Sequence, residues 1–295
     1  GGRRTEKGRR ASELLPAALA RVCAKIPFRK SMRWSTGETA FGRPVRWLLA
    51  LHGGSTLDFA FAGVTSGAVS YGHRFIAPDA FVLQHPSEYI PALRERHVIV
   101  DLKERSDTMV RRLQEASAKA GGKLIEDDFL VGENLSLVED PQILVGSFEP
   151  AYLSLPERVI LDVAKGHQRY FGMRGSDGKL LPSYLAVVGT ALLPENIRRG
   201  NDRVMRARLA DAKFFYDEDL RRPLSERRVA LDGVVFHKRL GTVGDKVRRL
   251  AKLIPQLGQE LGLSETTIKV ALEGSALCKC DLVSLMVGEL PELQG

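Results

Sequence analysis

The chain has 295 residues, of which 44% are apolar and 27% charged, and its formal net charge is +8. This length allows two domains with a substantial core, and the composition is that of an ordinary globular protein rather than a disordered or fibrous one. No run approaches the roughly 18 apolar residues of a membrane span, and the first residues lack the apolar core of a signal peptide. We therefore expect a cytoplasmic protein that makes no membrane contact.

The positive charge is concentrated in two regions. Residues 1–47 contain twelve Lys and Arg against three acids, and residues 221–252 contain ten against three. Clustered positive charge attracts nucleic acid without regard to its sequence. The three cysteines indicate no disulfide framework, and Cys278 and Cys280 lack the second ligand pair that a zinc site needs.

Hydrophobic periodicity and turn residues predict the elements in chain order. Residues 1–11 offer little to bury and are expected to be disordered. The other elements predicted before residue 200 are helices over 12–24, 85–96, 101–120 and 155–165, a hairpin of 41–51 with 57–64, and strands over 142–148 and 184–188. From Asn201 to Leu290 the pattern is helical almost without a break.

These elements predict an α+β fold for residues 1–220, followed by an all-helical segment over 221–295. The boundary is placed near residue 220, where the sequence DLRRPLSERR changes composition. The chain starts without methionine and stops within a helical pattern, so we expect a fragment of a longer protein with its helical domain truncated.

The segment from Arg198 to Asp219 is the most informative for function. Gly200-Asn201-Asp202 predicts a turn and helix cap, and the apolar spacing that follows predicts a helix with one buried stripe. Phe214 either stacks on unpaired bases or packs in the core, the second being favoured. A fan of guanidinium groups on such a helix suits a polyphosphate partner, and the cations concerned are Arg198, Arg199, Arg203, Arg206, Arg208 and Lys213.

Two histidines are candidates for a pocket. His73 lies in YGHRF beside Arg74, and its use in a turn or core is the favoured reading over RNA or ligand contact. His167 lies in KGHQRYF with Gln168, where polar groups of several kinds follow an apolar helix. No nucleophile elbow, phosphate-binding glycine loop or dinucleotide fingerprint is present, so no catalytic residues are predicted.

His237 and Asp281 form a weaker pair. Helical metal-dependent phosphohydrolases hold a divalent metal with two histidines and a carboxylate, but Cys280 stands where the second histidine would be. A lone His and Asp leave the metal short of ligands, so no metal site is predicted.

Eight ordered blocks together give the sequence a specific resemblance to a known family. They are KSMRW, RPVRW, GHRF, LPERVILDVAKGHQRYF, GKLLPSYLAVVGT, GNDRVMRARLADAKFFYDED, HKRLGTVGDK and KCDLVSLMVGELPELQG. In this order they resemble the beta subunit of bacterial tetrameric glycyl-tRNA synthetase over residues 30–295. The family's beta chain is longer, and this sequence is similar to its N-terminal and central part, without the C-terminal region expected to read the anticodon.

The resemblance implies an architecture and a set of partners. It implies an editing-type α+β domain, similar to that of the phenylalanyl-tRNA synthetase beta chain, followed by a helical HD-like domain. It also implies an alpha-two beta-two heterotetramer in which the alpha subunit activates glycine with ATP and magnesium. The beta chain would bind tRNA(Gly) without a catalytic centre or a bound cofactor of its own.

Four hypotheses follow. The main one is a tRNA-binding subunit fragment that neutralises phosphates with the six cations of 198–213 and with Arg33, Arg43, Arg46 and Arg74. The alternatives are an HD-type phosphohydrolase using His237 and Asp281, and a scaffold that docks the alpha subunit through the RPVRW strand or the helical last third. A fourth is hydrolysis of mischarged tRNA, with His73 or His167 as the base.

Overall fold

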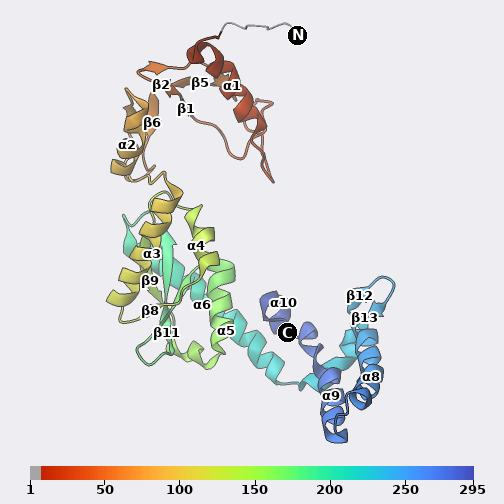
Figure 1. Ribbon diagram of the computed structural model, residues 1–295. Coiled ribbons are helices and arrows are strands. Elements are labelled where there is room, and N and C mark those ends of the chain that lie inside the picture. Colours follow the sequence, from red (N-terminus) through yellow and green to blue (C-terminus); the bar gives the residue numbers. More distant parts are fainter. Residues whose placement is uncertain (1–7) are drawn as a thin grey trace, which may run out of the picture. The chain divides into compact units, whose positions relative to one another are not determined.

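The computed structural model describes residues 8–295 (Figure 1). The chain divides into two compact units, Gly1–Met109 with Leu135–Pro141 and Val110–Asn134 with Gln142–Gly295. The predicted disorder of residues 1–11 falls mostly outside the described residues, although Ala11 already begins a helix. Residue 220 lies within the second unit, so its role as a domain boundary stays a prediction. No helix in the described part of the chain is long and apolar enough to cross a membrane.

The first unit combines helices with short strands. It contains α1 (Ala11–Lys25), β1 (Leu48–Leu49), β2 (Leu51–His52), β3 (Ser55–Thr56), β4 (Ala60–Phe61), β5 (Val64–Gly67), β6 (Val69–Tyr71), β7 (Ala80–Val82), η1 (Pro86–Glu88), α2 (Tyr89–Glu95) and the start of α3 (Leu102–Lys119). The strands form a three-stranded sheet in the order β1-β5-β4 and two hairpins, β2-β3 and β6-β7. The predicted helices over 12–24, 85–96 and 101–120 are confirmed.

The predicted hairpin of 41–51 with 57–64 is only partly formed. Two turns reverse the chain where one was expected, at Gly53 (φ 58°) and at Ala62–Gly63 (φ 54° and 78°). The first turn closes the short β2-β3 hairpin, and the second pairs β4 with β5, which then runs parallel to β1. Glycine adopts positive φ without steric cost, so the sequence allows a turn at Gly53 and another at Gly63. The pattern of apolar residues does not indicate which of these turns ends each strand.

The second unit is built on an antiparallel sheet in the order β8-β10-β11-β9. Its strands are β8 (Lys123–Leu124), β10 (Phe171–Arg174), β11 (Leu180–Val188) and β9 (Gln142–Ser147), and its first helices are α4 (Asp128–Leu135), η2 (Pro150–Ser154), α5 (Glu157–Val163) and the π-helix η3 (Ala164–Gln168). The predicted strands over 142–148 and 184–188 are confirmed, whereas β10 was missed. Tyr184 and Met205, both buried, belong to the core on one face of this sheet.

α6 (Pro194–Leu220) is the longest helix and begins earlier than predicted. The expected cap at Gly200-Asn201-Asp202 is wrong, because Pro194 starts the helix and these three residues lie inside it. Asp202 instead reaches sideways, where its Oδ1 accepts hydrogen bonds from the Ser147 amide (2.9 Å) and the Tyr184 hydroxyl (2.8 Å). The carboxylate therefore ties α6 to the sheet. Burial raises the pKa of Tyr184, and the hydrogen bond to Asp202 and the charge of that carboxylate raise it further.

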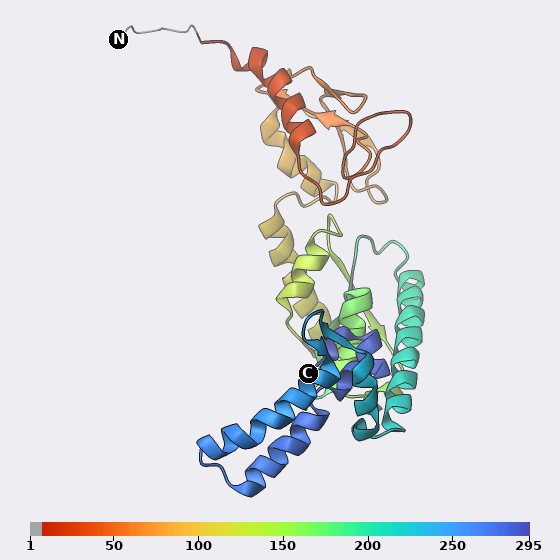
Figure 2. The same ribbon diagram turned by 90° about the vertical axis from the view of Figure 1, so that its right-hand side faces the viewer.

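The remaining elements are mostly helical. They are α7 (Leu224–Arg227), η4 (Arg228–Gly233), β12 (Val235–His237), β13 (Gly241–Thr242), α8 (Val243–Glu260), α9 (Glu265–Leu277), η5 (Cys280–Val283), α10 (Leu285–Glu289) and η6 (Pro291–Leu293). The expectation of an all-helical segment over 221–295 is wrong at the β12-β13 hairpin. α8 and α9 lie side by side in both views (Figure 1, Figure 2). Met286 and Leu290, from the α10 region, pack into the core of the sheet's helical face.

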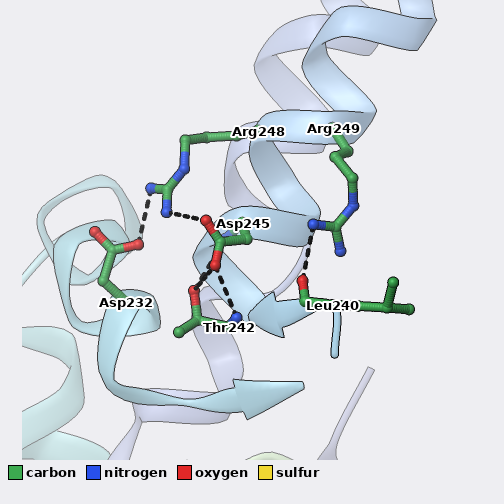
Figure 3. Close-up of polar contacts among 6 residues, drawn as sticks. All are labelled: Asp232, Leu240, Thr242, Asp245, Arg248 and Arg249. Carbon is green, nitrogen blue, oxygen red and sulfur yellow. Dashed lines mark hydrogen bonds and ion pairs between the residues drawn. The ribbon is translucent and has the colours of Figure 1, made fainter. Parts of the chain in front are cut away.

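A capping box starts α8 directly after the hairpin (Figure 3). The Thr242 hydroxyl accepts the Asp245 amide, and the Asp245 carboxylate accepts the Thr242 amide at 2.9 Å. Arg248 then bridges Asp245 and Asp232, each at 2.8 Å. The backbone hydrogen bond from Thr242, with help from Arg248, lowers the pKa of Asp245 to about 2. The mixed α+β class is confirmed, while the editing-type and HD-like identities of its domains stay predictions.

Candidate nucleic-acid interface

Two sequence blocks, RPVRW and YGHRF, meet in the first unit. Trp47 directly precedes β1 and Tyr71 ends β6, and the two rings lie 4.7 Å apart between centroids with their planes tilted by 54°. Around them is a cavity of about 330 Å³, which we call the Trp47 pocket, lined by Arg46, Trp47, Tyr71, Gly72, Arg74 and Pro78. The predicted RNA-binding residues Arg46 and Arg74 are thus brought together beside two aromatic rings.

The charge at this site is predominantly positive. A larger cavity of about 510 Å³ shares most of the same lining and adds Arg43 and His73, with Glu139 as its acidic residue. Arg46 forms no ion pair or hydrogen bond with any residue in the described range. Arg43 donates to the Gly42 carbonyl at 3.3 Å, and the Arg74 guanidinium lies 5.2 Å from the centre of the Phe75 ring. These cations keep their charge available to an anion.

His73 supports the loop that carries Arg74. Its side chain is buried, and its Nδ1 accepts hydrogen bonds from the Phe75 and Ile76 amides at 3.3 and 3.4 Å. The preceding Gly72 is required by space, because a Cβ there would lie 2.5 Å from the Arg96 Cβ. The favoured reading of His73 as a turn-stabilising residue therefore agrees with its contacts, although the ring also lines the larger cavity.

His167 and Gln168 lie in the second unit, in the π-helix η3. The His167 Nε2 lies 3.9 Å from the Glu289 Oε1. A cavity of about 520 Å³ adjoins this helix and is lined by three cations and three acids, namely Arg158, Lys165, Arg169, Glu133, Asp162 and Glu292. Each of these cations already has a carboxylate partner at 3.0 Å or less. The site is therefore close to neutral and offers little to a phosphate.

The cations of α6 divide into two classes. Arg198 contacts Glu195 (2.5 Å) and Asp202 (3.3 Å), Arg206 contacts Glu149 (2.5 Å), and Lys213 contacts Asp217 (2.9 Å). The protein's own acids thus neutralise three of the six predicted RNA-binding residues on this helix. Glu149 belongs to a distant part of the chain, so sequence reasoning had no signal for its ion pair with Arg206.

The other α6 cations are less engaged. Arg199 donates to the Asn196 side chain, which carries no charge. Arg203 and Arg208 have no ion pair or hydrogen bond with any described residue; Arg203 is exposed and Arg208 half-buried. Phe214 is 58% exposed, so the favoured core packing is wrong for this ring, while the neighbouring Phe215 contacts the core. An aromatic surface therefore lies on the same helix as the available arginines.

Residues outside the predicted set also contribute positive charge. Lys238 and Arg239 lie in the turn of the β12-β13 hairpin and have no carboxylate partner among the residues described. Lys246 lies over the Phe236 ring at 4.3 Å, and Arg249 donates to the Leu240 carbonyl at 2.9 Å (Figure 3). The charge excess of residues 221–252 was the available signal for this cluster. Arg33, by contrast, is exposed in the loop before β1 and outside both cavities.

His237 and Asp281 take part in local hydrogen bonds. The His237 Nδ1 accepts the Arg239 amide at 3.1 Å, and the Asp281 carboxylate accepts the Gly295 amide at 2.9 Å. Within residues 8–295 there is no group of three or more His, Cys, Asp or Glu side chains arranged to hold a metal ion. These contacts give the phosphohydrolase alternative no geometric support.

The family model for the glycyl-tRNA synthetase beta subunit matches residues 2–295. The chain belongs to this family. The glycine–tRNA ligase beta subunit of Myxococcus xanthus is 45% identical over 98% of this chain and 41% of its own length. Those of Syntrophomonas wolfei and Moorella thermoacetica are each 42% identical over 98% of this chain and 42% of their lengths. The resemblance seen in the eight sequence blocks is confirmed, and this member spans about two fifths of the length of the curated relatives it matches.

Proposed function

We propose that this chain is a tRNA-binding part of a glycine–tRNA ligase beta subunit. It would have no catalytic centre and would support the ATP-dependent glycylation of tRNA by an alpha subunit. The observation that carries this proposal is the set of arginines left without acidic partners. Two of them, Arg46 and Arg74, flank exposed aromatic rings, and on α6 Arg203 is exposed and Arg208 half-buried.

The physical basis is neutralisation of phosphates. Arginine presents a planar fork of donors that matches a phosphate, and the release of condensed counterions drives association. The self-neutralised Arg198, Arg206 and Lys213 would contribute less, because binding RNA would require them to exchange one anion for another. Among the arginines without an acidic partner, the strongest candidates are Arg43, Arg46, Arg74, Arg203 and Arg208. Arg199 already donates to the Asn196 side chain, and Arg33 lies outside both cavities.

The test is filter binding of tRNA(Gly) across a salt series. Five engaged phosphates predict that log affinity falls against log salt with a slope of about −3.5 to −4.5. Replacing the five arginines by alanine should flatten this slope and abolish binding, with circular dichroism confirming that the variant folds. A flat profile for the unmodified chain would refute the proposal.

A second role, docking of the alpha subunit, is favoured by one observation. Leu253, Leu257 and Leu261 follow one another at helical spacing along α8 and its end, and their side chains are 49%, 52% and 70% exposed. Such a stripe suits an apolar interface that persists at high salt. Co-purification with the alpha subunit at about 0.5 M salt, where surface ion pairs are screened, tests this role. Loss of the complex at that salt would contradict it.

A further inference from the structure

We propose that the Trp47 pocket binds one unstacked nucleotide of single-stranded RNA. The base would lie against Trp47 or Tyr71, and Arg46 and Arg74 would hold the flanking phosphates. This inference rests on the proposed function and deepens it, because it states which kind of RNA element one site takes.

The first argument is the exposed aromatic surface. Trp47 is 41% and Tyr71 37% exposed, although the two rings contact each other. Because their planes are tilted by 54°, one base can stack on the face of one ring while its edge meets the other. Stacking on an aromatic side chain is the usual way in which proteins hold an unpaired base, and it tolerates different bases.

The second argument is charge. Arg46 and Arg74 line the pocket, and among the described residues no acid does; the larger cavity that shares most of this lining adds Arg43 and one acid, Glu139. The cavity beside η3 makes the comparison clear, since its three cations each face a carboxylate. Two available guanidinium groups beside aromatic rings match a ligand that joins a flat ring to an anion. A nucleotide has that chemistry, whereas an apolar protein segment would leave both arginines without a counter-charge.

The third argument is size and rigidity. A volume of about 330 Å³ lies at the small end of the range of about 300–1,000 Å³ typical of ligand sites. The pocket therefore fits one nucleotide but not a duplex, whose bases are stacked inside. Gly72 lines the pocket where its backbone is packed against Arg96, and buried His73 holds the loop that presents Arg74. A site held in this way loses little entropy when a ligand binds.

The experiment uses a fluorescein-labelled single-stranded hexaadenylate RNA and reads anisotropy together with tryptophan fluorescence. The chain has two tryptophans, so Trp34→Phe leaves Trp47 as the reporter. We expect saturable quenching in this variant with unchanged affinity. Trp47→Leu should weaken hexamer binding by about five- to 150-fold, the range for losing one stacked base. Trp47→Phe, which keeps an aromatic face, should recover most of the affinity, and thermal melting of each variant controls for folding.

The arginines provide an independent readout. Arg46→Ala and Arg74→Ala should each lower the magnitude of the salt slope for the hexamer by about 0.7, the value for one single-strand phosphate. Unchanged hexamer affinity in folded Trp47→Leu, or no quenching in Trp34→Phe, would overturn the inference. If tRNA binds with the expected salt slope while the hexamer does not, the pocket proposal fails and the proposed function stands. If neither RNA binds, both fail.

Discussion

Arg203 and Arg198 lie on the same helix, and the structure predicts very different roles for them in binding tRNA. Each variant, Arg203→Ala or Arg198→Ala, removes one positive charge, so the long-range attraction of RNA changes equally. Locally, Arg203 has no ion pair or hydrogen bond with any described residue, whereas Arg198 contacts Glu195 and Asp202. The pair is therefore a matched test of whether an available guanidinium, rather than net charge, determines binding.

The expected magnitude follows from counterion release. One phosphate contact contributes about 0.7–0.9 to the salt slope, which is roughly a five- to eightfold gain in affinity at about 0.1 M salt. Arg203→Ala should therefore weaken tRNA binding by that factor and lower the slope by the same amount. Adding Arg208→Ala should bring the loss to roughly 25- to 60-fold if the two contacts are independent. Arg198→Ala should weaken binding by no more than about twofold and leave the slope unchanged.

Filter binding between about 0.05 and 0.3 M salt measures all four proteins, and circular dichroism shows whether α6 persists. Arg198→Ala is the variant with the greater risk to folding, since it removes the cation beside Asp202, the carboxylate that ties α6 to the sheet. Equal losses for the two single variants, with both folded, would refute the division of α6 cations into available and neutralised ones. An unchanged slope in Arg203→Ala would exclude that side chain from the interface.

Other expectations concern the scaffold. Thr242→Ala should lower the free energy of unfolding by about 1 kcal/mol in denaturant titrations, because it removes the N-cap of α8. Because the pKa of Asp245 is lowered to about 2, its ionised form stabilises the folded state. The stability difference between the unmodified chain and Asp245→Asn should be complete above about pH 4, the unfolded pKa, and should shrink as the pH falls toward 2. A difference that stays constant over this range in thermal melts would contradict the assignment. Tyr184→Phe removes the hydrogen bond from the Tyr184 hydroxyl to the Asp202 carboxylate and should lower the free energy of unfolding in urea by about 2 kcal/mol. An unchanged urea midpoint would show that this bond does not stabilise the contact between α6 and the sheet. Gly72→Ala should lower the stability of the first unit by about 1–3 kcal/mol, because the added Cβ would clash with Arg96. A melting temperature equal to that of the unmodified chain in calorimetry would contradict this.

Periodicity was sufficient for the longer elements. The predicted strand over 142–148 and the helix over 101–120 are formed as β9 and α3, since each has enough residues for its apolar spacing to be distinctive. The short β10 and the β12-β13 hairpin were missed, because a few residues carry too little pattern. At Gly200-Asn201-Asp202 a local cap signal was misleading. Instead of starting a helix, these residues lie inside α6, where the Asp202 carboxylate accepts two hydrogen bonds from the sheet.

The sequence by itself determined the family, the α+β class and which residues carry positive charge, because composition and ordered motifs are local properties of the chain. Only the tertiary structure decided which of those charges remain available. Arg206 is neutralised by Glu149, and Trp47 meets Tyr71, through contacts between segments that are distant in the chain. Counter-charges and neighbouring rings act over a few ångströms in space, and that proximity is set by folding rather than by position in the sequence.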